Sequence, residues 1–376
     1  MDDRVVSAIL AMLAGAAVGV VLFVPFVALS YRRRGGVSFW RAVAWAGFAV
    51  YFFAIWTYTL LPLPDPDALR CVGAITDPMT VVDDIRTALA GPGNPLRSPE
   101  LLQLVFNVLL FVPLGFFVRV LFGRGFVVTV LIGFAVSLLV ETTQLTGVWG
   151  IYPCAYRFFD VGDLMTNTTG ALIGALLSLV VPARHRGMAR TADADDPDPV
   201  TRRRRALAAF CDVLGAGLVA ATAGVATQLA LQVVFDDREA VVDGSLATLV
   251  SALAPIVVWL AVILATGRSI GDLAVALRYQ GGPQPEALAR VMRFLGGVGG
   301  YHLLALLPAG WSGLAFVFGV VAFVMVFTTA GGRGLPGILS GRHLVDAREP
   351  LDARAPAAGA AQTSAVSPRS RSTGSR

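Results

Sequence analysis

The stretch RFFDVGDLMTNTTG, residues 157–170, carries several charged residues at the start of an apolar segment. Arg157, Asp160, Asp163 and Asn167 lie three or four positions apart, so a helix would place them on one face. Three kinds of chemistry suit this set. The residues could form a closed network of ion pairs and hydrogen bonds, bind a polar headgroup or ligand, or act catalytically.

Two other segments carry polar residues of the same kind. Glu141 and Gln144 are about one helical turn apart, and Asn107 lies within another apolar run. The acids Glu141, Asp160 and Asp163 could bind a divalent cation through their oxygens or divide acid and base roles. The sequence has no pattern of a His, Cys or Ser nucleophile near them. It leaves catalysis open but favours a structural or binding role.

The composition indicates a membrane protein. Of the 376 residues, 56% are hydrophobic and 15% are charged, whereas about a quarter of the residues in soluble domains are charged. The apolar runs match the thickness of a bilayer, which about 20 helical residues can cross. The three Cys and three His are too few for a Cys/His zinc cluster. No Walker or dinucleotide motif occurs, so we expect no bound metal and no cofactor.

About nine apolar runs predict an all-α, polytopic transmembrane protein with two helical bundles. We expect a first unit with five spans in residues 1–182 and a second unit with four spans in residues 202–348. Residues 183–201 are polar and predict a cytoplasmic linker, and residues 349–376 predict a disordered basic tail. The expected spans lie at about 5–31, 40–61, 101–122, 126–145, 163–181, 206–235, 245–265, 292–307 and 311–330.

Basic residues predict how these spans are oriented. Arg32–Arg34, Arg119 with Arg124, and Arg202–Arg205 all lie in connections on one side of the predicted bundle. Cytoplasmic loops are enriched in Lys and Arg. We therefore expect a multi-pass protein of the cell membrane with its N-terminus outside and its C-terminus in the cytoplasm. Short basic runs of this kind indicate contact with lipid headgroups, and we expect no nucleic-acid partner.

This orientation brings the polar residues to the outer ends of three spans. The run with Asn107 enters from outside, the run with Glu141 ends there, and the run after Arg157 begins there. Ionisable groups at membrane depth pair with one another or serve a function. Arg157 could pair with Asp160 or Glu141, which would leave at least one carboxylate for another role.

Two cysteines lie in loops that face outside in this orientation. Cys71 and Cys154 could form a disulfide there, because oxidation is possible outside the cytoplasm, or they could be two unrelated thiols. Cys211 lies within an expected span, where packing is its expected role.

Residues 45–182 resemble the VanZ-like family of bacterial membrane proteins. The resemblance rests on three motifs in order: FNVLLFVPLGFF with Asn107, ETTQ with Glu141 and Gln144, and RFFDVGDLMTNTTGALIGALL with Gly170 and Gly174. The two glycines have the spacing that lets helices approach closely. The family is named for a protein that gives low-level resistance to the glycopeptide antibiotic teicoplanin. The resemblance therefore implies a cell-envelope role on the outer face, but it supplies no reaction.

Residues 202–348 resemble the RDD family at fewer positions. The motif RALAAFCD has Arg205 at the start of a span and Asp212 two turns inside it, and TGRSIGDLAVALRY is similar to the loop after that family's second span. The chain departs from the family at Asp272, where Lys is usual, and at Gly337, which replaces a second Asp. Transport has been suggested for the family. Asp212 could instead pair with Arg205 or with a neighbouring helix.

Together these features favour a non-enzymatic envelope protein over an enzyme. Its first unit would bind, shield or present a cell-wall or lipid-linked component at the outer leaflet. Arg157 would meet an anionic group, while Asn107, Gln144 and Asn167 would supply neutral hydrogen bonds. The alternatives are an enzyme that acts on a lipid-linked envelope precursor and a transporter that works through the second unit and Asp212. The lipid bilayer is the expected partner, and the sequence sets no oligomeric state.

Overall fold

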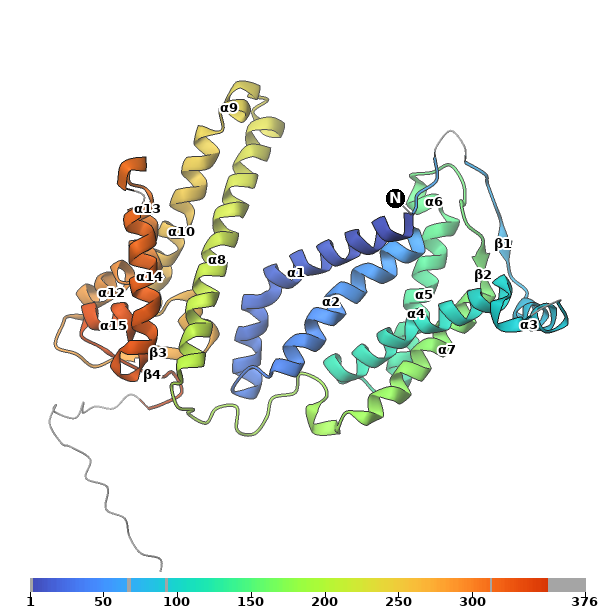
Figure 1. Ribbon diagram of the computed structural model, residues 1–376, viewed down its shortest axis with the longest axis horizontal. Helices are drawn as coiled ribbons and strands as arrows, with labels where there is room; N and C mark the ends of the chain where they lie inside the picture. The colour runs from blue at the N-terminus through green and yellow to red at the C-terminus, as the bar shows by residue number, and fades with distance from the viewer. Residues whose placement is uncertain (1–2, 66–68, 92–93, 312, 351–376) are drawn as a thin grey trace, which may run out of the picture.

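The computed structural model describes residues 3–65, 69–91, 94–311 and 313–350, and it is mostly helical over them (Figure 1). Seven of the described helices are long and apolar enough to cross a bilayer. The predicted all-α, polytopic membrane fold is therefore confirmed. From residue 351 onward, the predicted basic tail lies outside the described residues.

The first unit holds five of these seven helices, close to the predicted positions. They are α1 (Asp3–Arg34), α2 (Phe39–Leu60), α4 (Pro99–Phe122), α5 (Phe126–Leu145) and α7 (Val161–Leu177). The connections of α2 to α4 and of α5 to α7 contain short elements, which are β1 (Ala74–Ile75), α3 (Thr80–Ala90), α6 (Gly147–Gly150) and β2 (Phe159–Asp160).

Local sequence signals set the two ends of α4. The Ser98 hydroxyl accepts a hydrogen bond from the Leu101 N–H (3.2 Å), and Pro99 follows at the first helical position, where a missing N–H costs nothing. Gly123 ends the helix with a φ of 67°, which glycine adopts without strain. The 24 residues of α4 extend about 36 Å, enough to cross a hydrocarbon core.

Helices α4 and α7 pack backbone to backbone. A Cβ atom on Gly170 would lie 2.1 Å from the Val108 carbonyl oxygen, and one on Gly174 would lie 1.9 Å from that of Val112. On α4, a Cβ on Gly115 would lie 1.9 Å from the carbonyl oxygen of Ala171. Only glycine fits at these three positions. The close helix approach predicted from the glycine spacing is confirmed.

The second unit begins with two long helices, α8 (Arg202–Leu229) and α10 (Ser245–Thr266), which are the other two of the seven. Shorter elements complete it: α9 (Arg238–Asp243), α11 (Ile270–Ala274), β3 (Leu277–Gln280), α12 (Glu286–Leu295), α13 (Val298–Ala305), α14 (Gly313–Thr328), α15 (Gly334–Ser340) and β4 (His343–Asp346). Strands β3 and β4 pair antiparallel.

The span expected at 292–307 is replaced by two short helices. Helix α12 ends before Gly296, and Gly297 has non-helical backbone angles (φ −118°, ψ −144°) before α13 begins. The chain turns at the glycine pair 296–297, and Arg293 of α12 is buried in an ion pair with Asp272 (2.7 Å). The last expected span is α14, an apolar helix of 16 residues that is shorter than the other spans. Among the described residues, seven helices instead of about nine are thus long and apolar enough to cross a bilayer.

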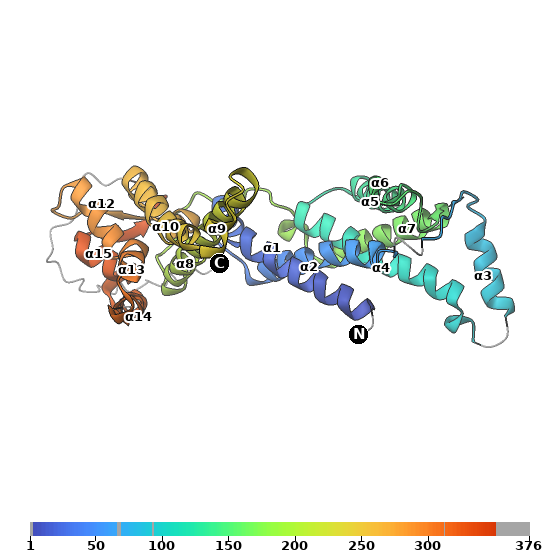
Figure 2. The same cartoon turned by 90° about the horizontal axis from the view of Figure 1, so that it is seen from above.

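Helix α1 contacts both units. It lies beside α2, and its C-terminal half approaches α8 (Figure 1). Val27 and Tyr31 of α1 belong to one buried apolar cluster with Ala208 and Cys211 of α8. In the view turned by 90°, the helices of the two units occupy opposite ends of the long axis, with α1 reaching between them (Figure 2).

The polar linker packs along the basic end of α1. The Arg33 guanidinium donates to the Met188 carbonyl (2.9 Å), and Arg34 donates to the Gly187 carbonyl (2.9 Å). In return, the Thr191 N–H donates to the Arg33 carbonyl (2.9 Å). The carbonyls of the linker thus satisfy part of the charge that the sequence gathers at Arg32–Arg34.

Candidate functional site

A two-residue strand pair positions the start of α7. Strands β1 and β2 run parallel, with Ile75 opposite Asp160. Next to this pair, the Val72 N–H donates to the Ala155 carbonyl (3.0 Å). The sulfur atoms of Cys71 and Cys154 are bonded to one another here, with 5.5 Å between their Cα atoms. Two loops far apart in the sequence are thereby joined beside the polar residues.

Asp160 and Glu141 meet at the N-terminus of α7. Asp160 is the N-cap residue, and its carboxylate accepts a hydrogen bond from the Gly162 N–H (2.7 Å). Its own N–H donates to a carboxylate oxygen of Glu141 (3.0 Å). Glu141 lies near the end of α5 and is only 2% exposed. The positive end of the α7 dipole favours both acids at this position.

The asparagines connect α7 to its two neighbouring helices. The Asn107 amide on α4 donates to the Asp163 carboxylate (2.6 Å). The Asn167 amide on α7 donates to the Ser137 hydroxyl on α5 (2.9 Å), and its oxygen is buried without a hydrogen-bond partner among the described residues. These bonds hold α4, α5 and α7 in register at the level of the predicted site.

Arg157 and Gln144 bind the end of α2 instead of the acids. The Arg157 guanidinium donates to the carbonyls of Thr59 (3.0 Å) and Leu61 (3.4 Å). The Gln144 amide also donates to the Thr59 carbonyl (2.7 Å). The last carbonyls of a helix lack intrahelical partners and carry partial negative charge, so they attract donors. The suggested pairing of Arg157 with Asp160 or Glu141 does not occur among the described ion pairs.

Three residues that contact or border this site were not predicted from the sequence. The carbonyl of Thr59 gives no sequence signal, because any residue could supply it. Ser137 lies four residues before Glu141 on α5, and this helical spacing could have indicated it. Asp84 of α3 is a further neighbour: partial burial raises its pKa, with added repulsion from Asp160 and then Glu100.

Glu141, Asp160 and Asp163 do not converge on a metal site, because the described residues contain no group of three His, Cys, Asp or Glu that could hold an ion.

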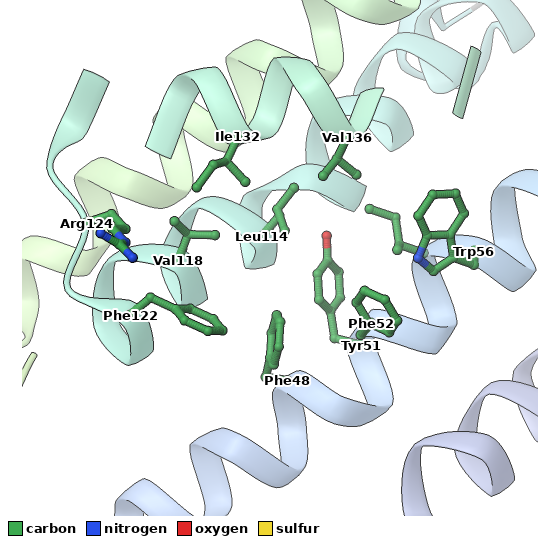
Figure 3. Close-up of a pocket in the computed structure, with 11 residues that line it drawn as sticks. Phe48, Tyr51, Phe52, Trp56, Leu114, Val118, Phe122, Arg124, Ile132 and Val136 are labelled. Atoms are coloured by element: carbon green, nitrogen blue, oxygen red, sulfur yellow. The ribbon is translucent and has the colours of Figure 1, made fainter. Parts of the chain in front are cut away.

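An apolar cleft of about 320 Å³ lies along α2, α4 and α5 (Figure 3). Phe48 and Trp56 of α2 line one wall, and Leu114 and Val136 line the other. Arg124, in the connection between α4 and α5, lies at one end of the cleft. Trp56 lies at the opposite end, one helical turn or less from the Thr59 carbonyl that Arg157 binds.

Asp272 is the centre of a buried ion cluster in the second unit. Its carboxylate accepts hydrogen bonds from Arg205 (2.9 Å) and Arg293 (2.7 Å), and all three side chains are nearly inaccessible to solvent. Ser269 and Asp272 form a capping box at the start of α11. That motif is readable in the sequence, but the convergence of Arg205 and Arg293 on Asp272 was not predicted.

Asp212 has a separate set of partners. It accepts hydrogen bonds from the Trp259 indole (2.8 Å), the Ser269 hydroxyl (2.7 Å) and the Gly271 N–H (2.7 Å). Of the two suggested pairings, the structure therefore shows the one with neighbouring elements and not the one with Arg205. Trp259 is fully buried in α10, and its indole role carries no local sequence signal.

Comparison with known proteins finds a family match within the first unit. Residues 48–182 match the family model described as VanZ/LLP1, and these residues include α4, α5, α7 and every polar residue described at their ends. No curated protein and no solved structure matches the chain. Residues 48–182 are therefore similar to the VanZ/LLP1 family, within a chain whose long apolar helices are typical of a polytopic membrane protein.

Proposed function

We propose that the VanZ-like domain binds a lipid-linked component of the cell envelope at the outer leaflet. By shielding or presenting that component, it would contribute to resistance against glycopeptides such as teicoplanin. The apolar cleft would hold part of the lipid chain, and the polar end of the domain would meet the headgroup.

The proposal rests on one observation: Arg157 lies just beyond the apolar cleft. Ile55 lines the cleft, and Thr59, whose carbonyl binds Arg157, is the residue one turn farther along α2, about 6 Å along the helix axis. Gln144 donates to the same carbonyl and so links α5 to the end of α2. An amphiphile with its chain in the cleft would thus bring its head to Arg157.

The polar residues would divide their roles. Arg157 is partly exposed and uses two of its nitrogen atoms on carbonyls, so it retains N–H groups for a phosphate or carboxylate. Asp160 is also partly exposed and borders the same region. Asn107, Gln144 and Asn167 already donate to protein partners. We assign these three to positioning the helices and Arg157 to ligand contact.

The first test uses Arg157→Ala and Asp160→Asn, with teicoplanin susceptibility as the readout. We expect both variants to insert in the membrane at wild-type level and to lose the resistance that the wild-type chain confers. Arg86→Ala is the matched control, because Arg86 lies on α3 and, among the described residues, makes only an exposed ion pair with Asp83. Susceptibility identical to wild type in both site variants would refute the proposal.

A second test fills the cleft without touching any charge. Val136→Phe adds volume to the cleft wall, whereas Val127→Phe places the same side chain on the same helix at a position that is 73% exposed. We expect only Val136→Phe to abolish resistance. Equal susceptibility of the two variants, with normal insertion, would show that the cleft holds no ligand chain.

A further inference from the structure

The second unit contains a cavity of about 480 Å³ that is separate from the VanZ-like domain. It lies between α8, α10, α13 and α14, with charged groups at one end and apolar walls along the rest. Arg205, Asp272 and Arg293 form the charged end, and Val213 and Phe318 are among the wall residues. A cavity of this size with convergent polar groups at one end is typical of a small-molecule site.

The carboxylates at the charged end are already satisfied. Asp212 accepts three hydrogen bonds, from Trp259, Ser269 and Gly271. Asp272 accepts from both arginines and from the Ser269 N–H (3.2 Å). These acids therefore offer few lone pairs to a cation or to another donor.

The arginines, in contrast, have donors to spare. Each guanidinium carries five N–H groups, and each makes one hydrogen bond to Asp272. Arg205 is 6% exposed and Arg293 is 4% exposed, and the Nε atom of each has no hydrogen-bond partner among the described residues. The Arg293 guanidinium stacks over the Tyr279 ring, 4.1 Å from its centroid. Buried donors without acceptors are costly, so the site is short of acceptor oxygens.

We propose that this cavity binds an anionic amphiphile. The phosphate or carboxylate head would accept hydrogen bonds from Arg205 and Arg293, and one acyl chain would lie along the apolar walls. The cavity lining extends along α8 from Arg205 to Gly217, about 18 Å of helix, which gives room for a chain. The two acids balance the two arginines in charge, so recognition depends on directed hydrogen bonds more than on net charge.

The test uses the full-length protein in nanodiscs of zwitterionic lipid. Three probes separate the contributions: dodecyl phosphate, dodecyltrimethylammonium and inorganic phosphate. We expect saturable binding of dodecyl phosphate together with a rise in the unfolding temperature, and no saturable binding of the other two. Equal binding of the cationic amphiphile would refute recognition by the arginines. Equal binding of inorganic phosphate would refute the role of the chain.

Two variants locate the binding. A Cβ on Gly217 would meet no atom within 4 Å, and the same holds for Gly19 on α1. Gly217→Leu should fill the cavity and raise the Kd for dodecyl phosphate by about tenfold or more, while Gly19→Leu should leave it unchanged. Arg293→Lys keeps a cation beside Asp272 but removes the planar fork, so it should also weaken binding. A wild-type Kd in both cavity variants would overturn the assignment.

Discussion

Asp346 illustrates how single residues order the second unit. It is fully buried in β4, where its carboxylate accepts hydrogen bonds from Arg204 (2.7 Å) and Arg348 (2.7 Å). Burial alone would raise the pKa of Asp346. The hydrogen bonds from Arg348 and Arg204 outweigh it and hold the pKa well below its ordinary value of 3.8. Asp346 therefore joins the start of α8 to the end of the described chain.

Replacing Asp346 gives a prediction with a defined pH dependence. Because the folded-state pKa is lowered, the stabilisation is present above the unfolded-state pKa and is lost as the pH falls toward the folded-state value. Asp346→Asn should reduce the free energy of unfolding by about 3 kcal/mol at pH 7. Thermal unfolding of both proteins should show that this difference shrinks once the pH falls below about 4. A difference that stays constant down to that pH and below would contradict the assignment.

At the residue scale, the sequence revealed the polar side chains but not their partners. The polar character and helical spacing of Arg157, Asp160 and Asp163 can be read directly. The acceptors of Arg157 are backbone carbonyls of α2, nearly one hundred residues away in sequence, and backbone carbonyls leave no pattern of residue types. For Asp272 the difficulty is sequence distance: its two arginine partners come from α8 and α12, and one sequence does not show that these helices meet there.

At the element scale, α4 and α7 depend on glycines that allow backbone contact. Gly170→Ala and Gly174→Ala should each lower the free energy of unfolding by about 1–3 kcal/mol or more. The added methyl group would collide with backbone oxygens that cannot move aside. Gly217→Ala is the control, since its Cβ would meet open space. There the change should be neutral or stabilising by up to about 1 kcal/mol. Equal thermal stability of all three variants would contradict the close approach.

The loops that carry Cys71 and Cys154 are joined beside the candidate site. We expect a disulfide between Cys71 and Cys154, whose loop spans 83 residues. Loss of this disulfide in a Cys71→Ser, Cys154→Ser double variant should lower the free energy of unfolding by about 2–4 kcal/mol. Thiol-blocked protein should migrate differently on reducing and non-reducing gels, and Cys211→Ala should not change this. Labelling of both thiols without a reductant would disprove the bond.

Apolar runs are sufficient to predict the five long helices of the first unit. Each of the five runs of the first unit has a long apolar stretch that can only be satisfied as a helix in lipid, and all five helices form. The run at 292–307 has the same average character, but it includes Arg293 and two glycine pairs. Its helix is interrupted at the first glycine pair, and Arg293 lies in a buried ion pair with Asp272, a contact that a hydropathy pattern does not report.

At the scale of the whole molecule, α1 connects the two units. The sequence assigned it to the first unit by position along the chain. Its apolar cluster with Ala208 and Cys211 shows that it also packs on the second. Long-range packing of this kind depends on side-chain shape in three dimensions, which one sequence does not display. The division into two units and the basic-loop orientation both stay predictions.

The predicted orientation is the basis of the proposed function, because only that orientation would place Arg157 and Asp160 at the outer surface. The most direct test is a Phe158→Cys variant in a Cys211→Ala background, since Phe158 is 52% exposed and lies two residues from Asp160. A membrane-impermeant maleimide should label it in intact cells, while Arg203→Cys should react only after permeabilisation. Labelling of Phe158→Cys only after permeabilisation would place the site in the cytoplasm and contradict the proposal.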